Sequence, residues 1–80
     1  MFINKAPGNR NNICGKNIAS IRLCMEISQR ELADRVQLAG LEMDKNAIQR
    51  IESGQRFVTD IELKVFGKVL NKTLEELLNE

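Results

Sequence analysis

A group of side chains capable of directional hydrogen bonding lies within one short stretch of the chain, "MDKNAIQRIESG" (43–54). Ile48 and Ile51 are three residues apart, as on the buried face of a helix. At 100° per residue, the opposite face carries Lys45, Asn46, Gln49, Arg50 and Ser53. Asn and Gln can form paired hydrogen bonds to the edge of adenine, and Arg or Lys to that of guanine. A carboxylate-free face of this kind fits either a solvated helix or one that contacts a polyanion.

The helices that must position this face are indicated by apolar spacing and capping residues. The expected first helix has the apolar stripe Cys14, Ile18, Ile21 and Met25. Helix 45–53 is expected to begin after Asp44 and to end at Gly54. Capping boxes that start the other three helices are Ser28 with Glu31, Thr59 with Glu62, and Thr73 with Glu76. No strand-like alternation competes, so the sequence predicts a compact all-α domain of five short helices.

The 80 residues suffice for one small domain, which buries only about 60–65% of the surface of its unfolded chain. Its core is expected to be aliphatic, with Phe57 and Phe66 as the aromatic members, because the chain has no Trp or Tyr. Ile61 is expected on the apolar face of the fourth helix. Leu74, Leu77 and Leu78 fit either the core or a dimer seam. Residues 1–13 contain the only Pro and four Asn, and they are expected to form a flexible arm ahead of domain 14–80.

Composition excludes most catalytic and metal chemistry. There is no His, and two cysteines ten residues apart do not make a zinc site. Cys14 and Cys24 are expected to be reduced thiols that pack as small hydrophobes in a cytoplasmic protein. Glu75 and Glu76 point about 100° apart on a helix, which does not suit a catalytic pair. We expect neither an enzyme nor a cofactor, metal, small-molecule substrate or membrane-spanning segment.

Charge is distributed unevenly along the chain. Residues 1–56 carry nine Lys or Arg against six Asp or Glu, and residues 57–80 carry three against five. A basic front and an acidic back would orient the molecule toward a polyanion. Lys5 and Arg10 in the expected arm leave open a contact with phosphate.

Four segments in order resemble the Xre/lambda-repressor-like helix-turn-helix domains. They are "GKNIASIR" (15–22), "ISQRELADRV" (27–36), "AIQRIESGQR" (47–56) and "LKVFGKVLNKTLEELL" (63–78). The resemblance implies a sequence-specific DNA-binding regulator, most simply a repressor that acts as a homodimer on a palindromic double-stranded operator. A protein–protein interaction module on the same fold is the alternative.

The resemblance also implies roles for individual residues. Base edges would be contacted by Lys45, Asn46, Gln49 and Arg50. Phosphates would be contacted by Gln29, Gln55 and Arg56, and Arg30 fits either a phosphate contact or a solvated face. Arg22 and Glu52 match a pair that forms a structural salt bridge in relatives.

Two features depart from the family pattern. The segment "QLAGLEMDKNAI" (37–48) is longer than the family usually uses, so it is expected either to lengthen the second helix or to widen the turn. Leu38, Leu41 or Met43 would then pack on the core. Glu26 stands where many relatives carry a Gly that ends the first helix.

Overall fold

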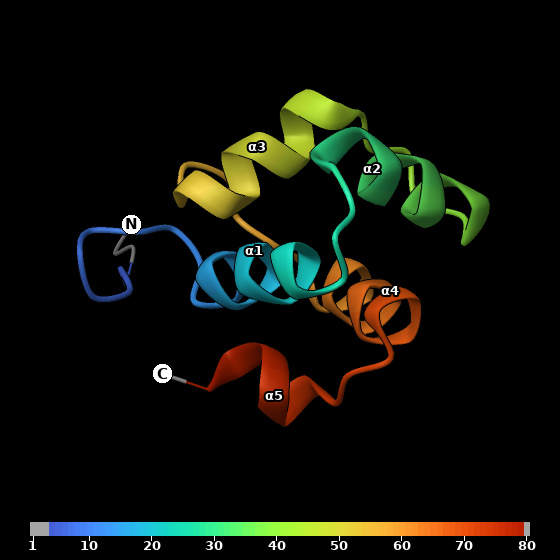
Figure 1. Cartoon of the computed structure of the whole chain (residues 1–80). Coiled ribbons are helices and arrows are strands. Elements are labelled where there is room, and N and C mark those ends of the chain that lie inside the picture. The colour runs from blue at the N-terminus through green and yellow to red at the C-terminus, as the bar shows by residue number, and fades with distance from the viewer. Residues whose placement is uncertain (1–3, 80) are drawn as a thin grey trace.

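Five helices pack together in the computed structural model, which describes residues 4–79 (Figure 1). They are α1 (Cys14–Cys24), α2 (Gln29–Leu38), α3 (Lys45–Ser53), α4 (Asp60–Leu70) and α5 (Leu74–Leu78). In the described part of the chain, the only β-type pairing is an isolated bridge between Ala6 and Arg10. The radius of gyration is 11.8 Å. The prediction of a compact all-α domain is therefore confirmed, and α3 has the predicted bounds.

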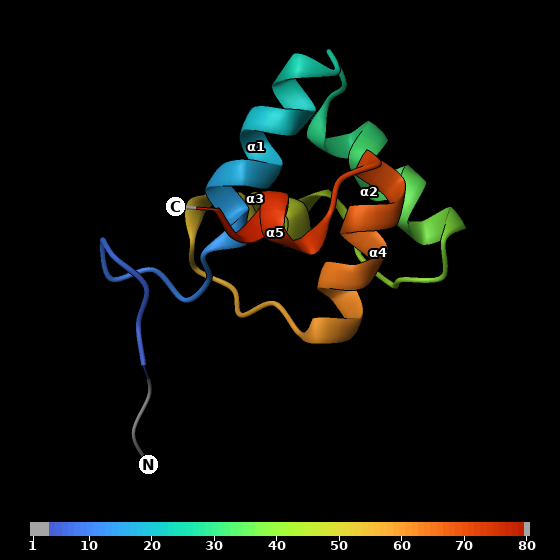
Figure 2. The same cartoon turned by 90° about the horizontal axis from the view of Figure 1, so that it is seen from below.

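Helix α1 lies between α3 on one side and α5 on the other (Figure 1). Helix α2 packs beside α3, and α4 contacts α1, α2 and α5. Seen from below, α5 lies in front and α3 behind (Figure 2). The outer face of α3 is therefore on the side of the molecule opposite α5, away from the fourth and fifth helices.

The predicted capping residues begin four of the helices. The side chains of Ser28, Asp44, Thr59 and Thr73 each accept a hydrogen bond from a backbone N–H in the first turn. The boxes of Thr59 and Thr73 are reciprocal, as predicted. The predicted box at Ser28 is only half formed, because the carboxylate of Glu31 lies 3.5 Å from the guanidinium of Arg35 instead.

Glu26 ends the turn after α1 in the left-handed conformation, with φ of +59°. A non-glycine residue there costs about 1–2 kcal/mol. Two hydrogen bonds hold this turn: Glu26 N donates to Leu23 O at 3.1 Å, and Ile27 N donates to Arg22 O at 3.2 Å. The departure from glycine is thus accommodated without losing the helix end.

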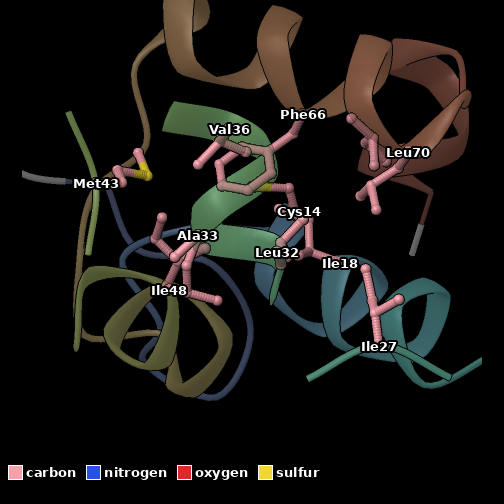
Figure 3. Close-up of a cluster of buried hydrophobic side chains, with 12 residues drawn as sticks. Cys14, Ile18, Ile27, Leu32, Ala33, Val36, Met43, Ile48, Phe66 and Leu70 are labelled. Atoms are coloured by element: carbon pink, nitrogen blue, oxygen red, sulfur yellow. The ribbon is translucent and has the colours of Figure 1, made fainter. Parts of the chain in front are cut away.

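The core lies where α1, α2, α3 and α4 meet (Figure 3). Phe66 from α4 points toward Val36 of α2 and Cys14 of α1 in this view. The buried apolar residues are Cys14, Ile18, Ile27, Leu32, Ala33, Val36, Met43, Ile48, Ile51, Phe66, Leu70 and Leu77. A single aromatic ring therefore anchors a mainly aliphatic core.

Two residues expected in the core are exposed instead. Phe57 is 54% exposed and Ile61 is 70% exposed. Phe57 precedes α4 in a loop, so helical spacing does not apply to it. Ile61 lies five residues before the buried Phe66, which places it about 140° around the helix. The prediction for Phe57 was wrong because it lies in a loop, and the prediction for Ile61 was wrong because the buried face of α4 is centred on Phe66.

Other apolar residues divide between the core and the surface. Met25, at the end of the predicted stripe of α1, is 37% exposed. Leu77 is buried, whereas Leu74 and Leu78 are 47% and 42% exposed. Cys14 is buried, and burial raises the pKa of its thiol to about 11. Cys24 is exposed, so the prediction that both thiols pack as small hydrophobes was wrong for Cys24.

The long segment before α3 widens the turn and leaves α2 ending at Leu38. Leu41 N donates to Val36 O at 3.0 Å, and the Gln37 amide donates to Met43 O at 2.6 Å. Met43 is 2% exposed, and Leu41 packs against the core. Leu38 is 90% exposed and does not fill the core. The turn therefore has its own anchor at Met43.

Candidate nucleic-acid interface

The outer face of α3 presents the four residues that the family resemblance leads us to expect at base edges. The side chains of Lys45, Asn46, Gln49 and Arg50 are all exposed. Within residues 4–79, none of these four side chains makes a hydrogen bond or an ion pair. A shallow hollow of about 360 Å³ on this face is lined by Asn46, Gln49, Arg50, Ser53 and Gln55. Unengaged donors and acceptors are therefore concentrated on one helix face.

The two acidic residues in and next to α3, Asp44 and Glu52, do not lie on its outer face. Asp44 caps α3, and its Oδ1 accepts a hydrogen bond from Ala47 N at 2.8 Å. Glu52 turns inward and forms a two-point ion pair with Arg22 of α1, with N–O distances of 2.8 and 3.1 Å. The two side chains are only 13% and 8% exposed. The structure thus brings Arg22 and Glu52 together and leaves the outer face without a carboxylate.

Gln29 is also drawn into this ion pair. Its Nε2 donates to Oε1 of Glu52 at 3.0 Å, so one carboxylate joins α1, α2 and α3. An amide nitrogen carries two protons, and the second is free to donate to a phosphate. Arg30, the next residue, is exposed. In the first turn of α2, Gln29 therefore contacts Glu52, whereas Arg30 lies in solvent.

The loop after α3 carries Gln55 and Arg56, the other residues expected to contact phosphates. Gln55 is exposed, whereas Arg56 forms two 2.9 Å hydrogen bonds to the carboxylate of Glu62. The guanidinium of Arg56 is the largest cause that holds the pKa of Glu62 below its ordinary value, and Glu62 in turn raises the pKa of Arg56. A phosphate would therefore compete with Glu62 for Arg56.

A buried asparagine within the stretch expected to form a flexible arm connects the end of α3 to the start of α1. Asn12 is 8% exposed, and its Nδ2 donates to Ile51 O at 3.0 Å and to Arg56 O at 2.7 Å. Its Oδ1 accepts from Gly15 N at 2.8 Å. One side-chain amide thus satisfies backbone groups of both helices. The available signal was an Asn just before a predicted helix, which is typical of an N-terminal cap.

The two preceding residues contact the same end of α3. Arg10 donates from Nη2 to Glu52 O at 2.8 Å, whereas its Nε is buried without a partner among residues 4–79. Asn11 donates from its backbone N to Gly54 O at 2.8 Å and from its side chain to Gln55 O at 2.9 Å. Arg10 is thus directed at α3 rather than free to reach a phosphate. The flexibility expected of residues 1–13 stays a prediction, and residues 1–3 lie outside the described residues.

The part of the chain that the structure describes contains no group of three or more His, Cys, Asp or Glu side chains placed to hold a metal ion. No helix in it has the length and apolar character needed to cross a bilayer. No family model, curated protein or solved structure matches this chain. Its function has therefore to be inferred from its residues and their arrangement.

Proposed function

We propose that this chain is a sequence-specific DNA-binding protein in which α2 and α3 act as a helix-turn-helix of the lambda-repressor-like type. The observation that carries the proposal is the outer face of α3, where four unengaged polar side chains lie together and the nearby acids are turned away. Side chains of these types recognise purine edges in the major groove. The opposite face of α3 buries Ile48 and Ile51, which fixes the helix on the domain.

In this proposal α3 enters the major groove, and α2 crosses the sugar–phosphate backbone. Lys45, Asn46, Gln49 and Arg50 contact base edges or adjacent phosphates. Phosphates are contacted by Arg30, Gln55, the free amide proton of Gln29 and, after exchange with Glu62, Arg56. The phosphate contacts supply affinity that does not depend on sequence, and the base contacts supply discrimination.

We further propose that the protein acts as a homodimer and as a repressor. Helix α3 has nine residues and is about 13 Å long, so a single copy covers only a few base pairs. Two copies related by two-fold symmetry would read half-sites one helical turn, about 34 Å, apart. Leu74 and Leu78 are partly exposed and stay candidates for the seam between copies. A dimer bound in this way would repress by covering its operator.

The test is selection of binding sites from random duplex DNA, followed by fluorescence anisotropy on the selected site. We expect a two-fold symmetric site and a steep dependence of affinity on salt. Replacing Asn46 or Gln49 by Ala should weaken binding about 5- to 150-fold and relax base preference. Lys68→Ala, on the exposed side of α4, is the surface control and should leave affinity unchanged. Absence of salt-dependent duplex binding would end the proposal.

A protein–protein interaction module is the second candidate, and the exposure of Phe57 and Ile61 favours it. Exposed apolar residues that join into one contiguous surface patch are typical of partner-binding sites, and these two residues are four positions apart in the chain. Neutralisation of Arg56 by Glu62 also lowers the positive charge beside α3. The two candidates differ in which surface matters. Substitutions on α3 should weaken DNA binding, and substitution of Phe57 and Ile61 by Ser should weaken partner binding.

A further inference from the structure

We infer that residues 10–12 form a brace that positions α3, so that this segment controls discrimination between DNA sequences without itself touching DNA. The inference rests on the proposed DNA-binding function. It concerns three residues that precede α1 and contact the end of α3 or the loop after it, about 40 positions further along the chain. They are positioning residues, because they would act on DNA through α3.

The brace donates hydrogen bonds to backbone carbonyls that would otherwise lack a partner at the end of a helix. The last carbonyls of a helix have no partner within it and need one from elsewhere. Carbonyls from both the last turn of α3 and the loop after it accept hydrogen bonds from the brace. These acceptors are the carbonyl oxygens of Ile51, Glu52, Gly54, Gln55 and Arg56. The positive charge of Arg10 also stands at the negative end of the α3 dipole. The last turn of α3 and residues 54–56 are therefore held to one another through the brace.

Two glycines lie so close to the brace that a side chain at either position would have to displace part of it. A Cβ on Gly54 would lie 2.7 Å from Cζ of Arg10, and Gly54 has a φ of +87°. A Cβ on Gly15 would lie 2.6 Å from Oδ1 of Asn12 and 2.7 Å from Nη2 of Arg10. The fit is thus close on both sides of the segment, at the end of α3 and at the start of α1.

Such a brace should affect sequence-specific and non-specific binding differently. Hydrogen bonds to base edges need the reading side chains within about 0.5 Å of the productive geometry. Attraction to phosphates is long-range and tolerates small displacements. Gln49 and Arg50 lie in the half of α3 that ends in this last turn. Loosening the turn should therefore reduce affinity for the selected site and leave affinity for unrelated DNA unchanged.

Arg10→Ala and Lys5→Ala make a matched pair for testing the brace. Each removes one positive charge from the N-terminal segment, but only Arg10 contacts α3, since Lys5 donates to Asn11 Oδ1 at 2.8 Å. We expect Arg10→Ala to lower affinity for the selected site about tenfold, the effect of losing charge-assisted hydrogen bonding, with an unchanged salt slope. Lys5→Ala removes one hydrogen bond to Asn11 of the brace but none to α3, so its effect should be much smaller than that of Arg10→Ala. Asn12→Ser should behave like Arg10→Ala, and Asn11→Ala, at a half-buried position, provides a milder variant if either fails to fold.

Backbone amide hydrogen exchange provides a readout that does not need DNA. Protection of the amides of Gly54, Gln55 and Arg56, which donate to carbonyls in α3, should fall in Arg10→Ala and not in Lys5→Ala. If both variants weaken binding to all DNA alike and reduce the salt slope, the segment is a phosphate-contacting arm and the inference is overturned. Unchanged exchange and unchanged discrimination would overturn it as well. If the wild-type protein binds no duplex, the proposed function fails, and the exchange data alone decide whether the brace holds α3.

Discussion

Replacing Gly15 by Ala should destabilise the protein, although the same change inside most helices is stabilising. Gly15 is buried in α1 where this helix meets the end of α3. A Cβ there would overlap the backbone carbonyl oxygen of Ile51 and lie 2.6 Å from Oδ1 of Asn12. A backbone carbonyl cannot swing aside as the end of a flexible side chain can. The added methyl group must therefore separate α1 from α3.

The size of the effect follows from three contributions. Ala gains at most about 1 kcal/mol over Gly from helix propensity. Overpacking a tight contact costs about 1–3 kcal/mol. Separation of α1 from α3 also weakens the hydrogen bonds of Asn12 to Ile51 and Arg56, each worth about 1 kcal/mol. The net expectation is a loss of about 2–4 kcal/mol, a large part of the total stability of a small domain.

Urea unfolding followed by far-ultraviolet circular dichroism measures this loss, because the chain has no Trp or Tyr for fluorescence. Ser20→Ala, on the exposed side of the same helix, is the control for propensity and should be neutral or slightly stabilising. We expect the midpoint of Gly15→Ala to fall and its m-value to stay the same. If Gly15→Ala proves as stable as the wild type, α1 and α3 do not approach each other in this way.

One labelling experiment and two substitutions test separate parts of the structure. A thiol reagent at pH 8 should label the exposed Cys24 quickly. Cys14 should be labelled only on unfolding, because burial shields its thiol and raises the thiol's pKa to about 11. Mass spectrometry of the labelled protein with and without urea checks both expectations. Arg56 lowers the pKa of Glu62 in the folded protein, so the ionised Glu62 stabilises the fold. This contribution is fully present above the pKa of the unfolded carboxyl and is lost as the pH falls through the folded value. Glu62→Gln should therefore flatten the decline of melting temperature below about pH 5, and an unchanged profile would count against the pair. Ile61→Ser should change the free energy of unfolding by less than about 0.5 kcal/mol, because the side chain is 70% exposed; a loss as large as that of a core residue would contradict its placement.

The first residues of the helices were predictable from the sequence because N-terminal capping is a local interaction. A Ser, Thr or Asp side chain caps a backbone N–H only three residues further on, so the pattern is visible in a short window. Asp44, Thr59 and Thr73 act in this way. The box at Ser28 was only half correct because Glu31 has a competing partner, Arg35, four residues later. Even a local pattern therefore fails where two partners are within reach of one side chain.

Burial was less predictable, since spacing identifies a face but not its centre. The apolar residues of α4 nearly surround the helix, and only the structure shows that Phe66 defines the buried side. Ile61 fits the apolar composition of the helix and still lies in solvent. Residues 10–12 were missed for a different reason: their partners lie about 40 positions away, and Asn and Arg in a stretch with Pro and Gly resemble any loop.

The two ends of α3 are held in different ways, and this decides how the long turn before it would bear on the proposed DNA recognition. The C-terminal half is fixed by Glu52, which joins Arg22 and Gln29, and by the hydrogen bonds of residues 10–12. None of these contacts involves the turn. At the N-terminal end, the chain enters α3 from the turn through the buried Met43 and the Asp44 cap. Extra length in the turn can therefore alter the approach to Lys45 and Asn46, whereas the network around Glu52 fixes the half of the helix that carries Gln49 and Arg50.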